Sequence, residues 1–170
     1  MSEKKKITRA GLEKKQEELD HRIAVVRTEI AREIEFARSY GDLSENAEYT
    51  EAKKKQTENE TKIAELQDII ANVEVVEDDE IDDDRVSVGT TVTLKTMSPT
   101  NEDFMVTKGE IVRYAIVGDQ EADALQNRIS DESEVGRSLV GAKVGQKVTI
   151  PLDGYTLIYQ VKAIEKGDTL

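Results

Sequence analysis

Apolar side chains recur every three or four positions through the first 75 residues. No proline interrupts residues 7–40, and the only glycine in that stretch is Gly11. The first apolar run has successive steps of 7, 4, 3, 4, 4 and 3 residues and comprises Leu12, Leu19, Ile23, Val26, Ile30, Ile34 and Ala37. The second run alternates steps of 3 and 4 residues and comprises Tyr49, Ala52, Gln56, Asn59, Ile63, Leu66, Ile70 and Val73. Both spacings are typical of coiled coils, so the pattern predicts two long helices, the first capped by Thr8.

The break between the two runs is short, which favours an antiparallel hairpin. With the turn near residue 43, three pairs are expected to face each other: Leu19 with Leu66, Ile23 with Ile63, and Ile30 with Gln56. Polar Gln56 and Asn59 in the seam lower stability and favour one register. Each arm of about 30 residues would span roughly 45 Å, which suits a rod that presents its tip. A plain dimerising coiled coil fits the same periodicity.

The pattern changes to β-like alternation after residue 84. Strands are expected at 86–96, 104–106, 110–118, 147–151 and 155–165, and one short helix within 133–146. Thr107-Lys108-Gly109 and Asp153-Gly154 read as turns, and Gly141 as the stop of the helix. The expected fold is therefore α+β: an N-terminal antiparallel coiled-coil hairpin followed by a small α+β domain. That domain has no phosphate loop and no metal-ligand spacing, so it reads as a binding module.

The composition supports two small parts over one large core. Of 170 residues, 37% are hydrophobic, 4% aromatic and 35% charged, and the net charge is −12. That charge makes a free-standing DNA binder a poor interpretation. The absence of cysteine excludes disulfides, thiolate catalysis and zinc sites built on sulfur, and the single histidine, His21, leaves a Ser-His-Asp site only one possible base.

Residues 77–84 carry seven acids and no base, more than half of the net charge. A solvated linker is one interpretation of this run, and a carboxylate cluster for a divalent cation is the other. The run also suggests the division of the chain into a hairpin at 1–76, an acidic linker at 77–84 and a second domain at 85–170.

Two further observations concern location. No run approaches the roughly 18 apolar residues of a membrane span, and the N-terminus has no apolar core of the secretory type. We therefore expect a soluble, cytoplasmic protein that does not contact a membrane.

The turn of the hairpin holds two acids, Asp42 and Glu45, three positions apart. If the second helix begins near Leu43, both carboxylates project from its first turn. Mg²⁺ prefers oxygen ligands and is usually held by one or two carboxylates with phosphates and waters, so the pair could complete a metal site on a partner. The same spacing fits a capping box, with both acids favoured by the helix dipole. Spacing alone leaves both interpretations open.

The segment GDLSENAEY, residues 41–49, closely resembles the apex signature of the bacterial Gre transcript-cleavage factors. YAIVGDQEAD at 114–123, RIS at 128–130 and SLVGAKVG at 138–145 resemble the C-terminal domain of that family. The resemblance covers nearly the whole chain and is closer to the GreA-like branch. It implies a coiled-coil hairpin, a short acidic linker and an FKBP-like C-terminal domain that docks on RNA polymerase.

The resemblance also implies a function. The chain would be a transcription elongation factor that inserts its hairpin into the secondary channel of RNA polymerase. There it would stimulate the polymerase's own cleavage of backtracked RNA, without being an enzyme itself. Asp42 and Glu45 would be the acting pair, supporting a Mg²⁺ ion shared with the polymerase active site and orienting or activating the attacking water. No cofactor is expected in the free protein.

The partners implied are RNA polymerase and the 3′ end of backtracked RNA, and the chain is expected to be a monomer. Two alternatives to the cleavage function are a Gre-like inhibitor that occupies the polymerase channel and a structural coiled-coil adaptor.

Other residues near the tip carry secondary predictions. Arg38 and Lys53 align with basic positions of the family, so the resemblance implies RNA contacts, although solvated helix positions with nearby Glu partners explain such residues equally well. Asn46 and Tyr49 are expected to support the apex. The chain departs from the family at residues 133–136, where Ser-Glu-Val-Gly replaces a Ser-Pro-Ile-Ala type of segment, which leaves the mode of docking open.

Overall fold

The computed structural model describes residues 3–41 and 46–170. Contacts between residues group the chain into two compact units. One is Leu12–Asn72, and the other combines the N-terminal segment up to Gly11 with Val73–Leu170. The sequence predicts domain boundaries after residues 76 and 84. These boundaries stay a prediction, because they state which fragments fold and act alone.

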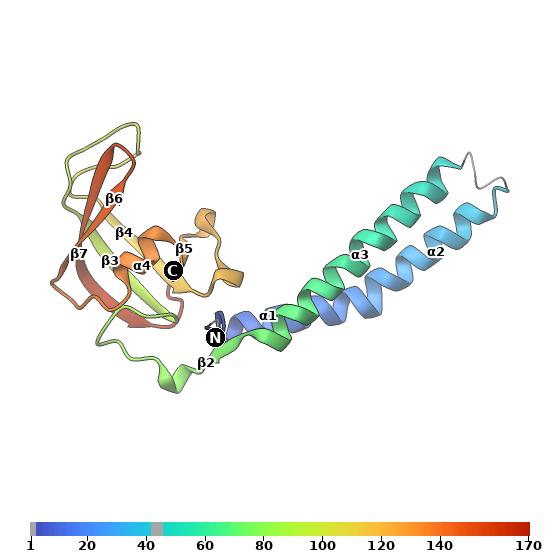
Figure 1. Ribbon diagram of the computed structural model, residues 1–170, viewed down its shortest axis with the longest axis horizontal. Helices are drawn as coiled ribbons and strands as arrows, with labels where there is room; N and C mark the ends of the chain where they lie inside the picture. Colours follow the sequence, from blue (N-terminus) through green and yellow to red (C-terminus); the bar gives the residue numbers. More distant parts are fainter. Residues whose placement is uncertain (1–2, 42–45) are drawn as a thin grey trace. The chain divides into compact units, whose positions relative to one another are not determined.

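The first unit is the predicted pair of antiparallel helices (Figure 1). The first arm consists of α1 (Arg9–His21), a π-helical turn (Arg22–Val26) and α2 (Arg27–Arg38), and α3 (Ala47–Asn72) forms the second arm. Two clusters of buried side chains join the arms. The cluster nearer the base comprises Leu19, Ile63 and Leu66, and the cluster nearer the tip comprises Ile30, Ile34 and Ala52. The coiled-coil seam and the facing of Leu19 with Leu66 are thereby confirmed.

One expected seam pair is wrong, because the π-helical turn adds a residue to the first arm. The Arg27 amide donates to the Arg22 carbonyl, five positions back, and the helix surface rotates so that Ile23 is 36% exposed and does not face Ile63 inside the seam. Arg22 lies opposite Asn59 instead, and its Nη1 donates to Asn59 Oδ1 at 3.3 Å. Asn59 Nδ2 donates to the Arg22 carbonyl at 3.4 Å, so the buried amide is hydrogen-bonded on both sides.

The start of the first arm is fixed within the second unit. The Gly11 amide donates to Thr8 Oγ1 at 3.0 Å, which confirms Thr8 as the cap of α1. Glu121 accepts from the Thr8 amide at 2.9 Å and from the Thr8 hydroxyl. Gly11 allows this approach, since a Cβ there would lie 2.1 Å from Glu121 Oε1.

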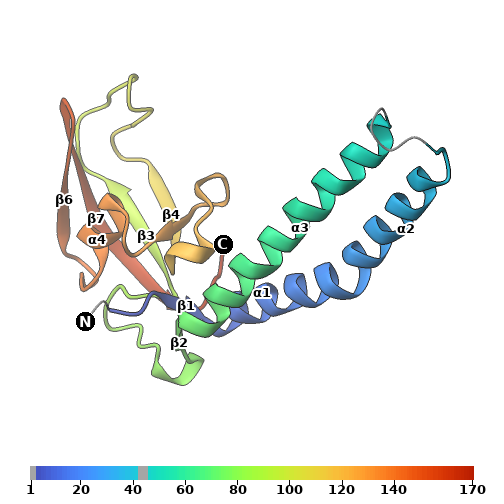
Figure 2. The same cartoon turned by 45° about the vertical axis from the view of Figure 1, so that its right-hand side comes forward.

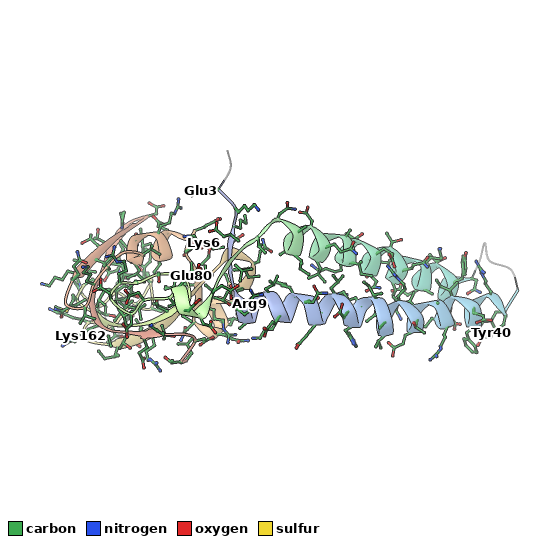
Figure 3. All side chains as sticks on the ribbon, turned by 90° about the horizontal axis from the view of Figure 1, so that it is seen from below. Glu3, Lys6, Arg9, Tyr40, Glu80 and Lys162 are labelled. Carbon is green, nitrogen blue, oxygen red and sulfur yellow. The ribbon has the colours of Figure 1, made fainter. Side chains whose placement is uncertain are left out.

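Two short strands complete the same region. β1 (Lys6–Thr8) pairs in parallel with β2 (Glu74–Val76), so the two ends of the hairpin sequence lie side by side (Figure 2). Next to β2, Arg9 forms an ion pair with Glu77, whose pKa is lowered by the hydrogen bond from the guanidinium; the side chains, Arg9 among those labelled, are drawn in Figure 3. The strand pair was missed from the sequence because its partners are more than 60 residues apart.

The rest of the second unit is a five-stranded sheet with one short α-helix and the 3₁₀ turns Asp78–Glu80, Asp119–Glu121 and Ala124–Gln126. The strands are β3 (Thr90–Thr96), β4 (Ile111–Val117), β5 (Arg128–Ser130), β6 (Lys147–Leu152) and β7 (Tyr155–Lys166), in the order β5-β4-β3-β7-β6. Only β4 and β5 pair in parallel; the other neighbours are antiparallel. The helix α4 (Glu134–Leu139) packs against β5 and β6, and its Leu139 is fully buried in the sheet core. The predicted α+β class is confirmed.

Three details of this domain correct the expectations. Residues 104–106 form no strand but part of a loop, closed by an isolated bridge between Asn101 and Val106. The strand expected from residue 86 begins at Thr90, because Gly89 turns the backbone with φ 94°. β5 was not predicted from its three residues, which are too few to show a period. The Asp153-Gly154 turn between β6 and β7 is confirmed.

The Glu121 contact yields a test of how the N-terminal segment is held. Replacing Glu121 with Ala removes the acceptor of the Thr8 amide and hydroxyl, and a lost charge-assisted hydrogen bond typically costs about 1–3 kcal/mol. The Thr8 amide should then exchange with deuterated solvent roughly 10- to 100-fold faster. Glu102→Ala, at an exposed carboxylate in the 98–109 loop, should leave that rate unchanged. Equal Thr8 exchange in the wild type and in Glu121→Ala would show that this carboxylate does not hold the segment.

Candidate functional site

The described tip of the hairpin consists of the end of α2, through Gly41, and the start of α3, from Asn46. Asp42 and Glu45 lie outside the described residues, so their assignment stays a prediction. The second helix was expected to begin near Leu43, but α3 begins at Ala47. Asn46 occupies the cap position of this helix, and the capping-box alternative for Asp42 and Glu45 lies outside the described residues.

Asn46 contacts both arms of the hairpin. Its Oδ1 accepts from the Tyr49 amide at 3.0 Å, which satisfies one of the free N–H groups in the first turn of α3. Its Nδ2 donates to the carbonyl of Ala37 at 2.7 Å, and Ala37 is the last buried residue of α2. The Asn46 side chain therefore contacts the last turn of α2 and caps the first turn of α3. Both contacts fit the predicted role of Asn46 at the apex.

Gly41 follows the C-terminal end of α2 and turns the backbone away from the helix. Its amide donates to the Arg38 carbonyl at 3.2 Å, and its φ of 96° lies in the left-handed region that glycine adopts without strain. A side chain at this position would be strained whatever the space around it. The chain thus turns away from α2 directly before the two candidate acids.

Tyr49 lies on the inner side of α3. Its half-buried ring packs against the seam cluster of Ile30, Ile34 and Ala52. The guanidinium carbon of Arg38 lies 6.0 Å from the ring centroid, at the outer limit of a cation–π contact. Tyr49 therefore connects the packing of the seam with the charge at the end of α2, as expected for a residue that supports the tip.

The lysines near the tip differ in their partners. Lys53 donates to the neutral amide oxygen of Gln56 at 2.6 Å, so this contact leaves its positive charge uncompensated. Lys55 instead crosses to the other arm and pairs with Glu33 at 2.8 Å, a hydrogen bond that raises the pKa of Lys55. Among residues 3–41 and 46–170 neither Arg38 nor Lys53 forms a salt bridge, whereas Lys55 is part of the hairpin's own structure.

The described residues offer no metal site of their own. Within 3–41 and 46–170, no three His, Cys, Asp or Glu side chains lie together in an arrangement that would hold an ion. The same part of the chain contains no helix of the length and apolar character needed to cross a membrane. The carboxylates of Asp42 and Glu45 are of the donor type that Mg²⁺ prefers, but two such groups need further ligands from elsewhere.

One feature of the tip was missed from the sequence. Phe36 of α2 and Tyr40, two residues beyond the end of that helix, are both 62% exposed, with their rings edge to face and their centroids 5.2 Å apart. Aromatic residues at positions i and i+4 outside the seam were the signal that could have identified them.

Comparison with known proteins gives a consistent result over both parts of the chain. A family profile for the N-terminal domain of the GreA/GreB transcription elongation factors matches residues 5–75, and one for the GreA/GreB C-terminal domain matches residues 81–166. Transcription elongation factor GreA of Caldanaerobacter subterraneus subsp. tengcongensis is 39% identical over 94% of this chain and 96% of its own length. The GreA of Clostridium perfringens strain SM101 is 42% identical over 98% and 100%. A solved structure of the GreA homologue Gfh1 of Thermus thermophilus is 23% identical, covers 96% of this chain and 99% of its own, and has a TM-score of 0.42.

The two contacts of Asn46 can be separated by substitution. Asn46→Ala removes both and should cost about 1 kcal/mol of local stability, seen as roughly five-fold faster hydrogen exchange at the Tyr49 amide. Asn46→Asp keeps an oxygen for that amide but loses the donor to Ala37, so Tyr49 should remain protected. If Asn46→Asp exposed the Tyr49 amide as strongly as Asn46→Ala, the link to Ala37 rather than the helix cap would be what orders this turn.

Proposed function

Because this chain belongs to the GreA/GreB family of transcription elongation factors, we propose that it rescues arrested RNA polymerase by stimulating cleavage of backtracked RNA. The hairpin enters the secondary channel, and the polymerase's own active site cuts the RNA. The observation that carries the proposal is the position of the GDLSENAEY segment at the turn between α2 and α3, where Asn46 joins both arms. The protein acts as a monomer in the cytoplasm, where the polymerase works.

Asp42 and Glu45 are the acting residues in this proposal. They are the two acids between Gly41 and Asn46, in the part of the sequence that joins the two arms of the hairpin. Their carboxylates donate oxygen ligands to the polymerase site and accept a hydrogen bond from the attacking water, which orients it toward the phosphate. A Mg²⁺ ion bound there would activate water and stabilise the charge that develops on the phosphate. Neither acid needs to bind the ion in the free protein, since the polymerase supplies the remaining ligands.

Arg38 and Lys53 are proposed to contact the RNA. They lie on opposite arms close to the tip, and neither forms a salt bridge with another described residue, so their charges can attract phosphates. The polymerase must supply most of the attraction, because this chain carries a net charge of −12.

The second domain is proposed to dock on the polymerase surface. At the departure from the family pattern, Ser133 caps α4 by accepting from the Gly136 amide at 3.0 Å. A Cβ on Gly136 would lie 1.9 Å from the Ser130 carbonyl oxygen, so this close packing requires glycine. The residues Ser-Glu-Val-Gly therefore serve the start of α4, and docking relies on surfaces other than a proline-containing segment.

Removing either acid should lower RNA cleavage without weakening the binding of the protein to polymerase. Asp42→Asn or Glu45→Gln is expected to lower the rate of cleavage in a stalled elongation complex by about 100-fold or more, because loss of one metal-orienting or charge-stabilising group often has that effect. Affinity for polymerase should stay near that of the wild type, since the seam and second domain are intact. Glu35→Gln, at an exposed acid on α2, is the matched control and should cleave normally.

The same assay distinguishes the alternatives. A channel-blocking inhibitor would bind polymerase without releasing short 3′ RNA fragments even as wild type. A structural adaptor would behave identically with and without both acids.

The basic residues give a salt-dependent test. Replacing both Arg38 and Lys53 with Ala should weaken cleavage through poorer engagement of the RNA, and the deficit should shrink at high salt, where the wild type also loses this attraction. Lys14→Ala with Lys62→Ala removes the same charge farther from the tip and should have little effect. A deficit that is constant across salt concentrations would instead indicate damage to the packing of Tyr49.

A further inference from the structure

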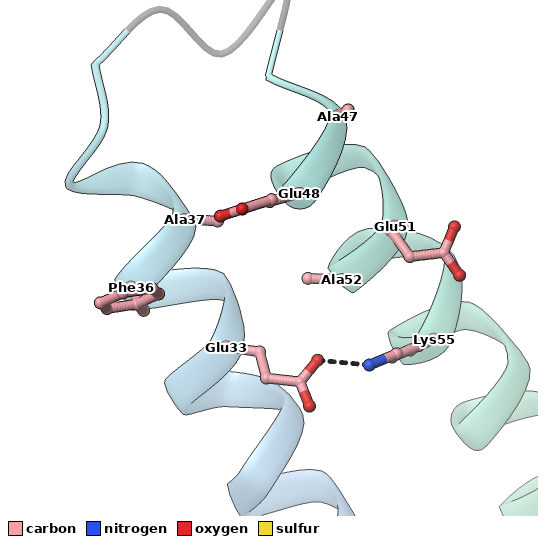
Figure 4. A pocket seen from close by; sticks show the side chains of 8 residues that line it. All are labelled: Glu33, Phe36, Ala37, Ala47, Glu48, Glu51, Ala52 and Lys55. Atoms are coloured by element: carbon pink, nitrogen blue, oxygen red, sulfur yellow. Dashed lines mark hydrogen bonds and ion pairs between the residues drawn. The ribbon is translucent and has the colours of Figure 1, made fainter.

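The hairpin carries a groove on one side, close to the tip. It has a volume of about 620 Å³ and is lined by Glu33, Phe36 and Ala37 of α2 and by Ala47, Glu48, Glu51, Ala52 and Lys55 of α3. All of these residues belong to the described hairpin unit, and Figure 4 shows the Glu48 side chain and the Glu33–Lys55 ion pair between the two helices, with Phe36 and Glu51 at the outer edges. Neither Arg38 nor Lys53, the proposed RNA contacts, lines it.

The floor of this groove is apolar and its edge is acidic. Ala37 and Ala52 are buried beneath it, while Phe36 stands exposed at one side. The Glu48 carboxylate extends from α3 across the groove toward Ala37 (Figure 4). Within residues 3–41 and 46–170, no salt bridge joins Glu48 or Glu51 to a cation, in contrast to Glu33, which is paired with Lys55.

This combination fits a long basic side chain better than a nucleic acid. Arginine and lysine bury an aliphatic stem against apolar surface and keep a charged end at the edge. An aromatic ring such as that of Phe36 adds cation–π attraction when the charge lies over its face. Phosphates, in contrast, would be repelled by the carboxylate of Glu48, which forms no salt bridge within the described residues, and by that of Glu51, which lies in the field of Lys55.

We propose that the groove is a docking site for an arginine or lysine side chain of the polymerase protein itself. The stem lies against Phe36, Ala37 and Ala52, and the cation pairs with Glu48 in the field of Glu51. This rests on the proposed function, because the hairpin must enter the polymerase for the contact to form. The two sets of residues near the tip then bind different partners. The groove binds a side chain of the polymerase protein, and Arg38 and Lys53 bind the RNA.

The first experiment measures the affinity of the full-length chain for purified polymerase in a stalled complex. Phe36→Ala and Glu48→Gln should each weaken binding about five- to ten-fold, and the double variant should lose less than the product of the two, because both residues hold one side chain. Phe36→Leu should recover most of the loss, and Glu35→Gln should bind as the wild type. Circular dichroism controls for the helix content of each variant.

The outcomes are separable from those of the cleavage proposal. The groove proposal is overturned if wild-type protein binds and cleaves while Phe36→Ala and Glu48→Gln bind equally well. If the wild type neither binds polymerase nor stimulates cleavage, the proposed function fails and the groove proposal with it.

A second experiment identifies the occupant. Phe36 is replaced by the photoreactive p-benzoylphenylalanine, and the full-length protein is irradiated in the stalled complex. A crosslink to a polymerase peptide that contains an arginine or lysine at or beside the attachment point supports the proposal. A crosslink to the RNA, to a second copy of this chain or to no molecule at all overturns it.

Discussion

The stability of the hairpin depends on the single apolar seam between its two arms. Two helices with no third layer can bury only one stripe each, so the stability of this unit comes from the contacts between α1–α2 and α3. Every other face of both helices meets water, which explains how 35% of the residues can be charged in a chain that still folds. The same restriction leaves most of the surface near the tip outside the apolar seam, where Lys55 pairs with Glu33 across the arms and other positions can carry functional groups.

The tip requires more than the seam, since the apolar stripe ends before it. Ala37 and Tyr49 are the last seam residues on the two arms, and beyond them Asn46 provides the connection by hydrogen bonds. Gly41 then permits the sharp exit from α2. Short-range polar contacts thus take over where hydrophobic packing stops, and they do so within a few residues of the proposed acting pair.

Much of the hairpin could be predicted from the sequence, because a seam repeats a local spacing many times. The facing of Leu19 with Leu66 and the cap by Thr8 follow from that repetition. The π-helical turn could not be predicted, since one inserted residue changes which side chain faces inward without changing the composition of the run; Arg22 thereby faces Asn59 where Ile23 was expected to face Ile63. The start of α3 was placed too early because Asp and Asn are both good helix caps, and the two hydrogen bonds of Asn46, from the Tyr49 amide and to the Ala37 carbonyl, became visible only in the structure.

The remaining features depend on contacts between residues far apart in the chain. Glu121 holds Thr8 and β1 pairs with β2, and no local pattern indicates either partner. The site itself was predicted from the resemblance of residues 41–49, whereas spacing alone left capping and metal support open. The position of Phe36 outside the seam could have been noticed in the sequence, but the groove beside it required the structure, because it is formed by residues of both α2 and α3.

The central claim is that the tip acids act on the metal chemistry of the polymerase. The most direct test is the rate of RNA cleavage in a stalled complex across a series of Mg²⁺ concentrations, with the wild type and with Asp42→Asn. If the carboxylate helps to retain the ion, the variant should require more Mg²⁺ for half its maximal rate and should recover part of its activity at high Mg²⁺. The same Mg²⁺ dependence in both proteins, with cleavage lower or unchanged at every concentration, would contradict it.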